Sequence, residues 1–296
     1  MSRDRGRLST AVSELPLTTG QELPARLGSE AERVGTSCGD GEMVWRIWGK
    51  GRPIVLLHGG HGSWEHWIRN IGPLSKHGKV IAGDLPGLGD SDPLSPPVDA
   101  PRLAEIVVSG IRKLAPEGDL VLGGFSLGSV ITAHAAAALG TYVRQVFLLG
   151  PAGLGAGWAD NSEGMLRRPY RASVAEQRAV VRHNLGVSMI GVPSQVDELA
   201  VDIQFRLTSR RRRLIGMPIS DSSATLDVMP DIASRAHVIA GDRDRYLQPN
   251  VAACLGRLNR EFPAMRTTIV KGAGHWVAYD AADRVNDLFV GSLGVH

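Results

Sequence analysis

Short apolar runs alternate with segments of helical periodicity along most of this chain. Runs of this length, bounded by glycine, proline and polar residues, predict β-strands rather than buried helices. Several of them are apolar throughout, which is typical of strands covered on both faces in a parallel sheet. Because strands and helices alternate, we predict an α/β fold built from βα units. The predicted strands are residues 42–48, 52–57, 79–83, 120–123, 143–149, 236–240 and 266–270, and the predicted helices include residues 101–114, 130–139 and 280–293.

The alternation breaks off after Gly150 and Pro151. From residue 153 to about residue 220 the chain has helical patterns and many arginines but no buried strand, and this stretch is too long for a simple connection. We interpret residues 153–220 as a helical cap or lid over the carboxyl edge of the sheet. Residues 1–31 have weak periodicity and are predicted to be a flexible extension or a loosely docked arm. The core is then expected in two parts, residues 32–152 and 221–296.

Composition favours a soluble globular enzyme and argues against several other classes. The 296 residues, 43% of them hydrophobic and 21% charged, are enough to bury a full core. The net charge is only +3 and the basic residues are spread out except at 210–213, so no nucleic-acid partner is expected. No apolar stretch has the length of a signal-peptide core or of a membrane span, so neither secretion nor membrane association is predicted. Cys38 and Cys254 are too few for a disulfide framework, which favours a reducing, cytoplasmic location.

A predicted strand is joined to a predicted helix by Gly124-Phe-Ser126-Leu-Gly128. A serine on such a sharp turn presents its hydroxyl above the edge of the sheet, and small residues two places to either side let strand and helix approach closely. Ser126 is therefore a candidate nucleophile. The alternative is a tight βα turn in which the serine only caps the helix.

A glycine-dense loop from His58 to Trp64 follows the predicted strand at 52–57. Its backbone N–H groups can point at a bound group without side chains in the way. The histidines at positions 58, 61 and 66 are not expected to hold a metal, because no carboxylate or thiol falls at matching spacing. We expect a structural role for His58 and keep His61 as a candidate substrate contact.

Asp244 and His275 each follow one of the last two predicted strands. The carboxyl ends of parallel strands meet at one edge of a sheet, so Ser126, Asp244 and His275 are predicted to converge there. A serine hydroxyl needs an imidazole base within hydrogen-bond reach, and a carboxylate then orients the imidazole. Asp242 is a rival for the carboxylate. Asp244 as a plain turn residue and His275 as a helix-start residue are the alternatives.

Together these motifs resemble those of the α/β-hydrolase superfamily. The resemblance covers roughly residues 32 to 293. It rests on His58-Gly-Gly60, the turn at Ser126, Gly241-Asp-Arg-Asp244 and Gly272-Ala-Gly-His275.

The resemblance implies a role for each site residue. Ser126 would attack a carbonyl, His275 would be the base and Asp244 would orient the imidazole, since the spacing of the family favours Asp244 over Asp242. The backbone N–H groups of Gly60 and Leu127 would form the oxyanion hole. No cofactor is expected.

Some details resemble the hydrolases that cleave carbon–carbon bonds in ring-opened aromatic catabolites, the meta-cleavage product hydrolases. These details are Gly150-Pro-Ala-Gly-Leu-Gly155 and the Trp276 that follows His275. The chain departs from that group at the loop after His58, which lacks a Gly-Pro-Gly, and at Phe125, which replaces a polar amide residue. A cap arginine for a substrate carboxylate is implied, for which Arg206 and Arg210–Arg213 are candidates. A solvated helix face is the alternative for these arginines.

We therefore predict hydrolysis of a carboxylic ester, in an apolar pocket built from Phe125, Trp276 and cap residues. Carbon–carbon or amide hydrolysis is the alternative reaction, and a non-catalytic small-molecule receptor is the alternative class. A serine at the turn, where dehalogenases and epoxide hydrolases need a carboxylate, argues against those two activities. The expected partner is a small carbonyl compound, apolar or aromatic, and assembly into a homo-oligomer stays open.

Overall fold

The computed structural model describes residues 19–155, 163–209, 217–247 and 249–294. The strands are β1 (Glu32–Cys38), β2 (Gly41–Trp48), β3 (Pro53–Leu57), β4 (Lys79–Gly83), β5 (Leu120–Phe125), β6 (Val143–Leu149), β7 (Ala236–Gly241) and β8 (Arg266–Val270). Within the described residues they form one sheet in the order β1-β2-β4-β3-β5-β6-β7-β8. The pairs β1–β2 and β2–β4 are antiparallel, and the remaining neighbours are parallel. The predicted α/β fold with a mostly parallel sheet is confirmed.

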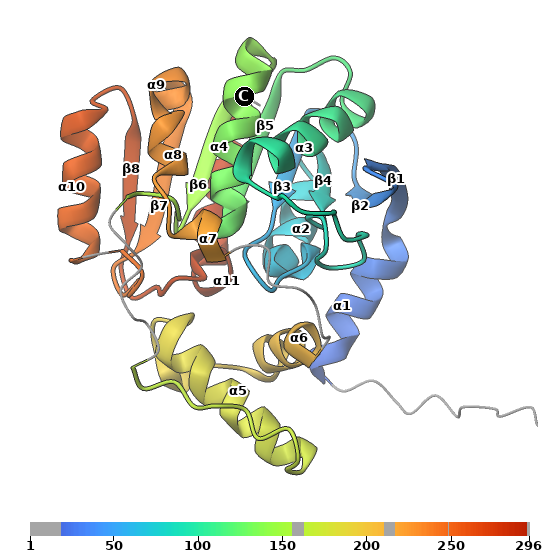
Figure 1. The fold of residues 1–296 in the computed structure, drawn as a ribbon, viewed down its shortest axis with the longest axis vertical. Coiled ribbons are helices and arrows are strands. Elements are labelled where there is room, and N and C mark those ends of the chain that lie inside the picture. Colours follow the sequence, from blue (N-terminus) through green and yellow to red (C-terminus); the bar gives the residue numbers. More distant parts are fainter. Residues whose placement is uncertain (1–18, 156–162, 210–216, 248, 295–296) are drawn as a thin grey trace, which may run out of the picture.

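Helices cover both faces of this sheet (Figure 1). They are α1 (Thr19–Glu30), α2 (Ile68–Ser75), α3 (Ala100–Leu114), α4 (Leu127–Leu139), α8 (Ala224–Asp227), α9 (Met229–Ile232), α10 (Val251–Glu261), α11 (Val277–Asp280) and α12 (Ala282–Ser292). In β3, Val55 and Leu57 lie in one core cluster with α3, α4 and α10, whereas Ile54 and Leu56 lie in a second with α1, α2 and α12. Side chains alternate between the faces of a strand, so a strand buried on both faces is apolar throughout.

A helical segment separates β6 from β7. It contains α5 (Val174–Ser188), α6 (Glu198–Ser209) and α7 (Met217–Ser220). Helix α5 begins with a capping box, in which Ser173 and Glu176 exchange hydrogen bonds and satisfy N–H groups of the first turn. Figure 1 shows α5 and α6 together below the sheet and its flanking helices. We call the described residues 163–209 the cap.

Residues 19–30 differ from the flexible extension predicted for residues 1–31. They form α1, which packs on the core through the buried Leu27, whose carbonyl accepts a 2.8 Å hydrogen bond from Trp48 Nε1. The other end of α1 touches the cap, because a Cβ added to Gly20 would lie 2.8 Å from a backbone oxygen of α6. Contacts distant in sequence thus hold a helix that local periodicity does not reveal.

The rest of that extension, residues 1–18, lies outside the described part of the chain. Among the described helices, none is both long and apolar enough to cross a membrane. Cys38 and Cys254 are both buried and carry free thiols.

Candidate active site

The turn between β5 and α4 holds Ser126 in a strained backbone conformation. Its φ of 51° and ψ of −119° lie where few residues other than glycine are found. Close packing requires the two flanking glycines: a Cβ on Gly124 would lie 2.3 Å from the carbonyl oxygen of Gly128, and a Cβ on Gly128 would lie 2.4 Å from that of His58. The predicted close approach of strand and helix is confirmed, and Ser126 lies at the carboxyl edge of the sheet, 9% exposed.

Asp244 and His275 meet at the same edge of the sheet. His275 Nδ1 lies 2.9 Å from Asp244 Oδ2, and both side chains are buried. The rival carboxylate, Asp242, instead accepts a 2.7 Å hydrogen bond from the backbone N–H of Gly272. When the Nδ1 proton is donated to a carboxylate, the Nε2 of a neutral imidazole is left as an acceptor, as a general base requires.

The end of β6 lies between Ser126 and His275. The backbone N–H of Ser126 donates to the carbonyl of Leu149 at 3.0 Å. The next residue, Gly150, has a φ of 46° and passes so close to the imidazole that an added Cβ would lie 3.0 Å from His275 Nδ1. The ring of Phe125 is also 5.1 Å from that of His275, centroid to centroid. These contacts bring the serine and the histidine to one place on the sheet edge.

Tyr246 covers the imidazole and was not identified from the sequence. Its ring centroid lies 4.3 Å from that of His275. Its backbone N–H donates to Asp244 Oδ1 at 2.9 Å, so each oxygen of that carboxylate accepts a hydrogen bond. Its hydroxyl bonds with Ser188 at the end of α5, and burial raises the pKa of the phenol, which stays protonated. Tyr246 lies in a turn two residues after Asp244, and no sequence pattern marks it.

The loop after β3 passes beside Ser126. A Cβ on Gly59 would lie 3.1 Å from the Cβ of Ser126, whereas the space beside Gly60 is open. His58 fixes the loop, as predicted: its Nε2 accepts from the backbone N–H of Leu85 at 2.9 Å, so its Nδ1 carries the proton and donates to the Gly59 carbonyl at 2.7 Å. The loop therefore has a defined position next to the serine.

His66 supports this loop from within the core. Its Nδ1 accepts from the backbone N–H of Gly59 at 3.2 Å, and its ring lies 5.0 Å from that of Trp276. Burial, reinforced by the neighbouring histidines, holds the pKa of His66 well below its usual value, so the ring is neutral. In the part of the chain that the structure describes, no group of three or more His, Cys, Asp or Glu side chains is placed to hold a metal ion.

Phe125 and Trp276 do not form the exposed pocket wall that the sequence suggests. They are 1% and 0% exposed, and Trp276 Nε1 donates to the His66 carbonyl at 2.8 Å. Both rings pack in the core behind the site, because large apolar side chains next to strand ends gain more from burial than from a place at the rim. His61, by contrast, is exposed, with a φ of 55°, and remains a candidate substrate contact.

Arg206 is held in a salt bridge between cap and core. Its guanidinium donates to both oxygens of Glu65, at 2.9 and 3.2 Å, and the Glu65 side chain is only 7% exposed. Three other cap arginines bond to partners within the cap, namely Arg168, Arg178 and Arg182. The candidates Arg210–Arg213 lie outside the described residues.

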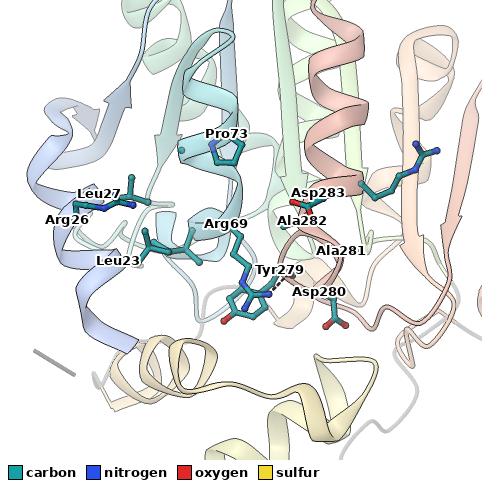
Figure 2. A pocket seen from close by; sticks show the side chains of 13 residues that line it. Leu23, Arg26, Leu27, Arg69, Pro73, Tyr279, Asp280, Ala281, Ala282 and Asp283 are labelled. Carbon is teal, nitrogen blue, oxygen red and sulfur yellow. Dashed lines mark hydrogen bonds between the residues drawn. The ribbon is translucent and has the colours of Figure 1, made fainter. Parts of the chain in front are cut away.

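A groove of about 590 Å³ lies between α1, α2 and the C-terminal helices (Figure 2). Its lining includes Tyr279 and Asp280 but none of the three residues of the predicted triad. Among its lining residues, the Arg69 guanidinium lies 3.9 Å from the centre of the Tyr279 ring and pairs with Asp197 of the cap. Because the groove is lined by core helices and by no residue of the predicted triad, we assign it no part in the chemistry.

Comparison with known families agrees with this architecture. Residues 54–288 match the model of the alpha/beta hydrolase family. The chain belongs to that family. The thermophilic esterase from Thermogutta terrifontis has the same fold, with a TM-score of 0.63 at 20% identity over 89% of this chain and 98% of that one.

Curated relatives of this alpha/beta hydrolase carry different names. It is 25% identical over 256 residues to the dihydrolipoyllysine-residue acetyltransferase component of the acetoin cleaving system of Pseudomonas putida; the match covers 83% of this chain but only 64% of that protein. It is 25% identical to the 2-hydroxy-6-oxo-6-phenylhexa-2,4-dienoate hydrolase of Burkholderia cepacia, over 81% of this chain and 87% of that one. It is 28% identical to the pimeloyl-(acyl-carrier protein) methyl ester esterase of Pseudoalteromonas atlantica, over 74% and 80%. The family and the hydrolases among these relatives support hydrolase activity.

Proposed function

We propose that this hydrolase cleaves a carboxylic ester or a related carbonyl compound through an acyl-enzyme on Ser126. The observation that carries the proposal is the buried 2.9 Å contact between His275 and Asp244 beside a serine with a φ of 51°. A strained serine next to an oriented imidazole is the arrangement that nucleophilic catalysis needs.

Each residue has a defined part in the proposed reaction. His275 Nε2 takes the hydroxyl proton of Ser126 as the oxygen attacks the carbonyl carbon, and it then gives that proton to the departing alcohol. Asp244 holds the Nδ1 proton and stabilises the imidazolium that forms. Water, deprotonated by the same imidazole, next attacks the acyl carbon, and the acid leaves as Ser126 regains its proton.

The negative charge of the tetrahedral intermediate would be met by the backbone N–H groups of Gly60 and Leu127. Leu127 opens α4, where N–H groups have no acceptor within the helix. Gly60 lies on the loop that contacts Ser126, next to open space. Loss of one such donor typically raises the barrier by ~3 kcal/mol.

Ester hydrolysis is favoured over cleavage of an acidic ring-opened catabolite by the state of Arg206, the described candidate for binding a substrate carboxylate. Arg206 is engaged by Glu65, so it offers no free guanidinium to a substrate carboxylate. Carbon–carbon hydrolysis remains the second candidate, because a relative named for that reaction matches 81% of the chain. A panel of short-chain esters, amides and vinylogous diketones separates the two, and faster turnover of the diketones would favour the second candidate.

A fluorophosphonate probe tests the proposal directly. We expect stoichiometric labelling of Ser126, and we expect Ser126→Ala to abolish turnover of p-nitrophenyl esters while the protein stays folded, since only a hydroxyl is removed. Ser129→Ala is a matched control, because Ser129 lies one helical turn away and donates to the Ser126 carbonyl at 2.6 Å. A folded wild type that neither labels nor turns over any ester would favour the receptor alternative.

We further propose a cytoplasmic location, supported by two buried thiols that suit a reducing compartment. Fractionation of the producing cells tests this. Recovery of the protein only outside the cytoplasm would contradict it.

A further inference from the structure

The segment that follows α5 within the cap is bonded to both loops that carry Asp244 and His275. We call residues 187–191, at the end of α5, the cap exit. Its carbonyl oxygens at Val187, Met189 and Gly191 accept hydrogen bonds at 3.1, 2.8 and 3.0 Å from the side chain of Arg245, the backbone of Trp276 and the side chain of Arg243. Each donor is the neighbour in sequence of Asp244 or of His275.

Asp280 joins the cap exit to the His275 loop through one atom. Its Oδ2 accepts from the backbone N–H of Gly191 at 2.6 Å and from that of Gly274 at 2.7 Å. Figure 2 shows the Asp280 carboxylate turned away from Arg69 and from the α1 side of the groove. A carboxylate oxygen has two lone pairs, and hydrogen bonds to an ionised acceptor are stronger than neutral ones. The carboxylate thus fixes the residue immediately before His275.

Gly191 and Gly274 are in direct backbone contact. A Cβ on Gly191 would lie 2.2 Å from the carbonyl oxygen of Gly272, and a Cβ on Gly274 would lie 2.6 Å from the amide nitrogen of Gly191. The N–H groups of Gly191 and Gly274 donate to the same carboxylate oxygen of Asp280. Removal of that carboxylate therefore removes the acceptor of both. The contact and the shared carboxylate define one arrangement of cap and loop.

We propose that Asp280 is a positioning residue, which sets the place of His275 by locking Gly274 to the cap exit at Gly191. This inference rests on the proposed function, in which His275 is the base. A shift of about 1 Å in a catalytic group can lower the rate about a hundredfold, whereas substrate binding is affected less. Asp280 therefore acts on kcat rather than on KM.

The test compares Asp280→Ala, Asp280→Asn and Gly191→Ala, with Asp283→Ala, an exposed carboxylate three residues along the chain from Asp280, as the control. Active sites are counted by fluorophosphonate labelling, and kcat and KM for a p-nitrophenyl ester are measured well below the melting temperature. We expect kcat per labelled site to fall about a hundredfold in Asp280→Ala and Gly191→Ala, with KM changed less than about threefold. Asp280→Asn, which keeps an acceptor oxygen, should recover part of the loss, and Asp283→Ala should match the wild type.

The double variant Asp280→Ala/Gly191→Ala decides whether the two residues act through one contact. We expect it to be no slower than the worse single variant. Equal kcat per labelled site in Asp280→Ala and wild type, with only a lower melting temperature, would show a purely structural role and overturn the inference. Additive losses in the double variant would overturn it too. Failure of the wild type to label would instead count against the proposed function itself.

Discussion

Replacement of Asp244 by asparagine is a sharp test of the site, because the structure leaves the new amide no good orientation. The carboxylate accepts two hydrogen bonds, one from His275 Nδ1 at 2.9 Å and one from the backbone N–H of Tyr246 at 2.9 Å. An amide has one accepting oxygen and one donating nitrogen. Whichever way it turns, one of the two N–H groups faces an NH₂ group unless the imidazole changes its tautomer.

The tautomer decides the size of the effect. If the amide oxygen accepts from Tyr246, its NH₂ donates to a deprotonated Nδ1, and the proton of His275 moves to Nε2, where it blocks the base. The orientation that keeps the active tautomer leaves two buried donors facing each other, at a cost of about 3 kcal/mol, so it is populated at about 1%. Loss of the charged acceptor that stabilises the imidazolium removes about 2–3 kcal/mol more. Together these effects lower kcat by about 10⁴-fold.

The assay is turnover of a p-nitrophenyl ester by Asp244→Asn, beside the rate of fluorophosphonate labelling. Asp242→Asn is the matched control, since its exposed carboxylate only accepts from Gly272 N–H and an amide oxygen can replace it. We expect the control to stay within about twofold of the wild type, with both variants folded. A reversed result, with Asp242→Asn inactive and Asp244→Asn active, would refute the assignment.

Three further predictions concern stability. Gly128→Ala should lower the melting temperature strongly, because its Cβ would lie 2.4 Å from a carbonyl oxygen, whereas Gly291→Ala, with open space around it, should be neutral or slightly stabilising. Arg206→Ala should cost about 2 kcal/mol in a denaturant titration because it leaves Glu65 unpaired, and Glu65→Ala in addition should restore part of it; an unchanged midpoint in Arg206→Ala would contradict this. Burial, helped by two nearby arginines, lowers the pKa of His237 from 6.5 to about 4. The unfolded chain therefore binds the extra proton as pH falls through 6.5, and unfolding free energy should drop by about 3 kcal/mol between pH 6.5 and 4, with a flatter profile in His237→Gln.

The sheet could be predicted because its strands are buried on both faces, and such strands are apolar runs that stand out in any sequence. β1 was missed because it pairs on one side only, is half exposed and contains a glycine and several polar residues. Helix α10 also went unpredicted, although its buried residues at 251, 254, 255 and 258 have the spacing of one helical face. Helix α1 shows no comparable row of apolar residues on one face. Contacts with both core and cap hold it in place, and these contacts are not visible in the sequence of the helix itself.

The proposed site divides in the same way. Asp244, rather than Asp242, was favoured by family spacing, and the structure gives the physical reason: the first carboxylate after β7 is used by the turn at Gly272, and the second reaches His275. The sequence predicts a pocket that contains Phe125 and Trp276, since the first precedes Ser126 and the second follows His275. Periodicity cannot tell a ring that lines a pocket from one that packs behind it.

Glycines, rather than side chains, explain why this site can be recognised in a sequence at all. Around His275 the backbone is so crowded that a Cβ on Gly150 would lie 2.8 Å from its carbonyl oxygen, and a Cβ on Gly241 would lie 2.1 Å from that of Ala273. Such positions accept no other residue without movement of the chain, so they leave a fixed pattern of letters. The carbonyl oxygens of the cap exit accept hydrogen bonds from Arg243, Arg245 and Trp276, and because any residue supplies such an oxygen, these positions of the cap exit leave no pattern. The proposed lock at Asp280 uses a side chain and two crowded glycines, but the letters alone do not show that they meet, and a measurement of kcat tests what their contact does.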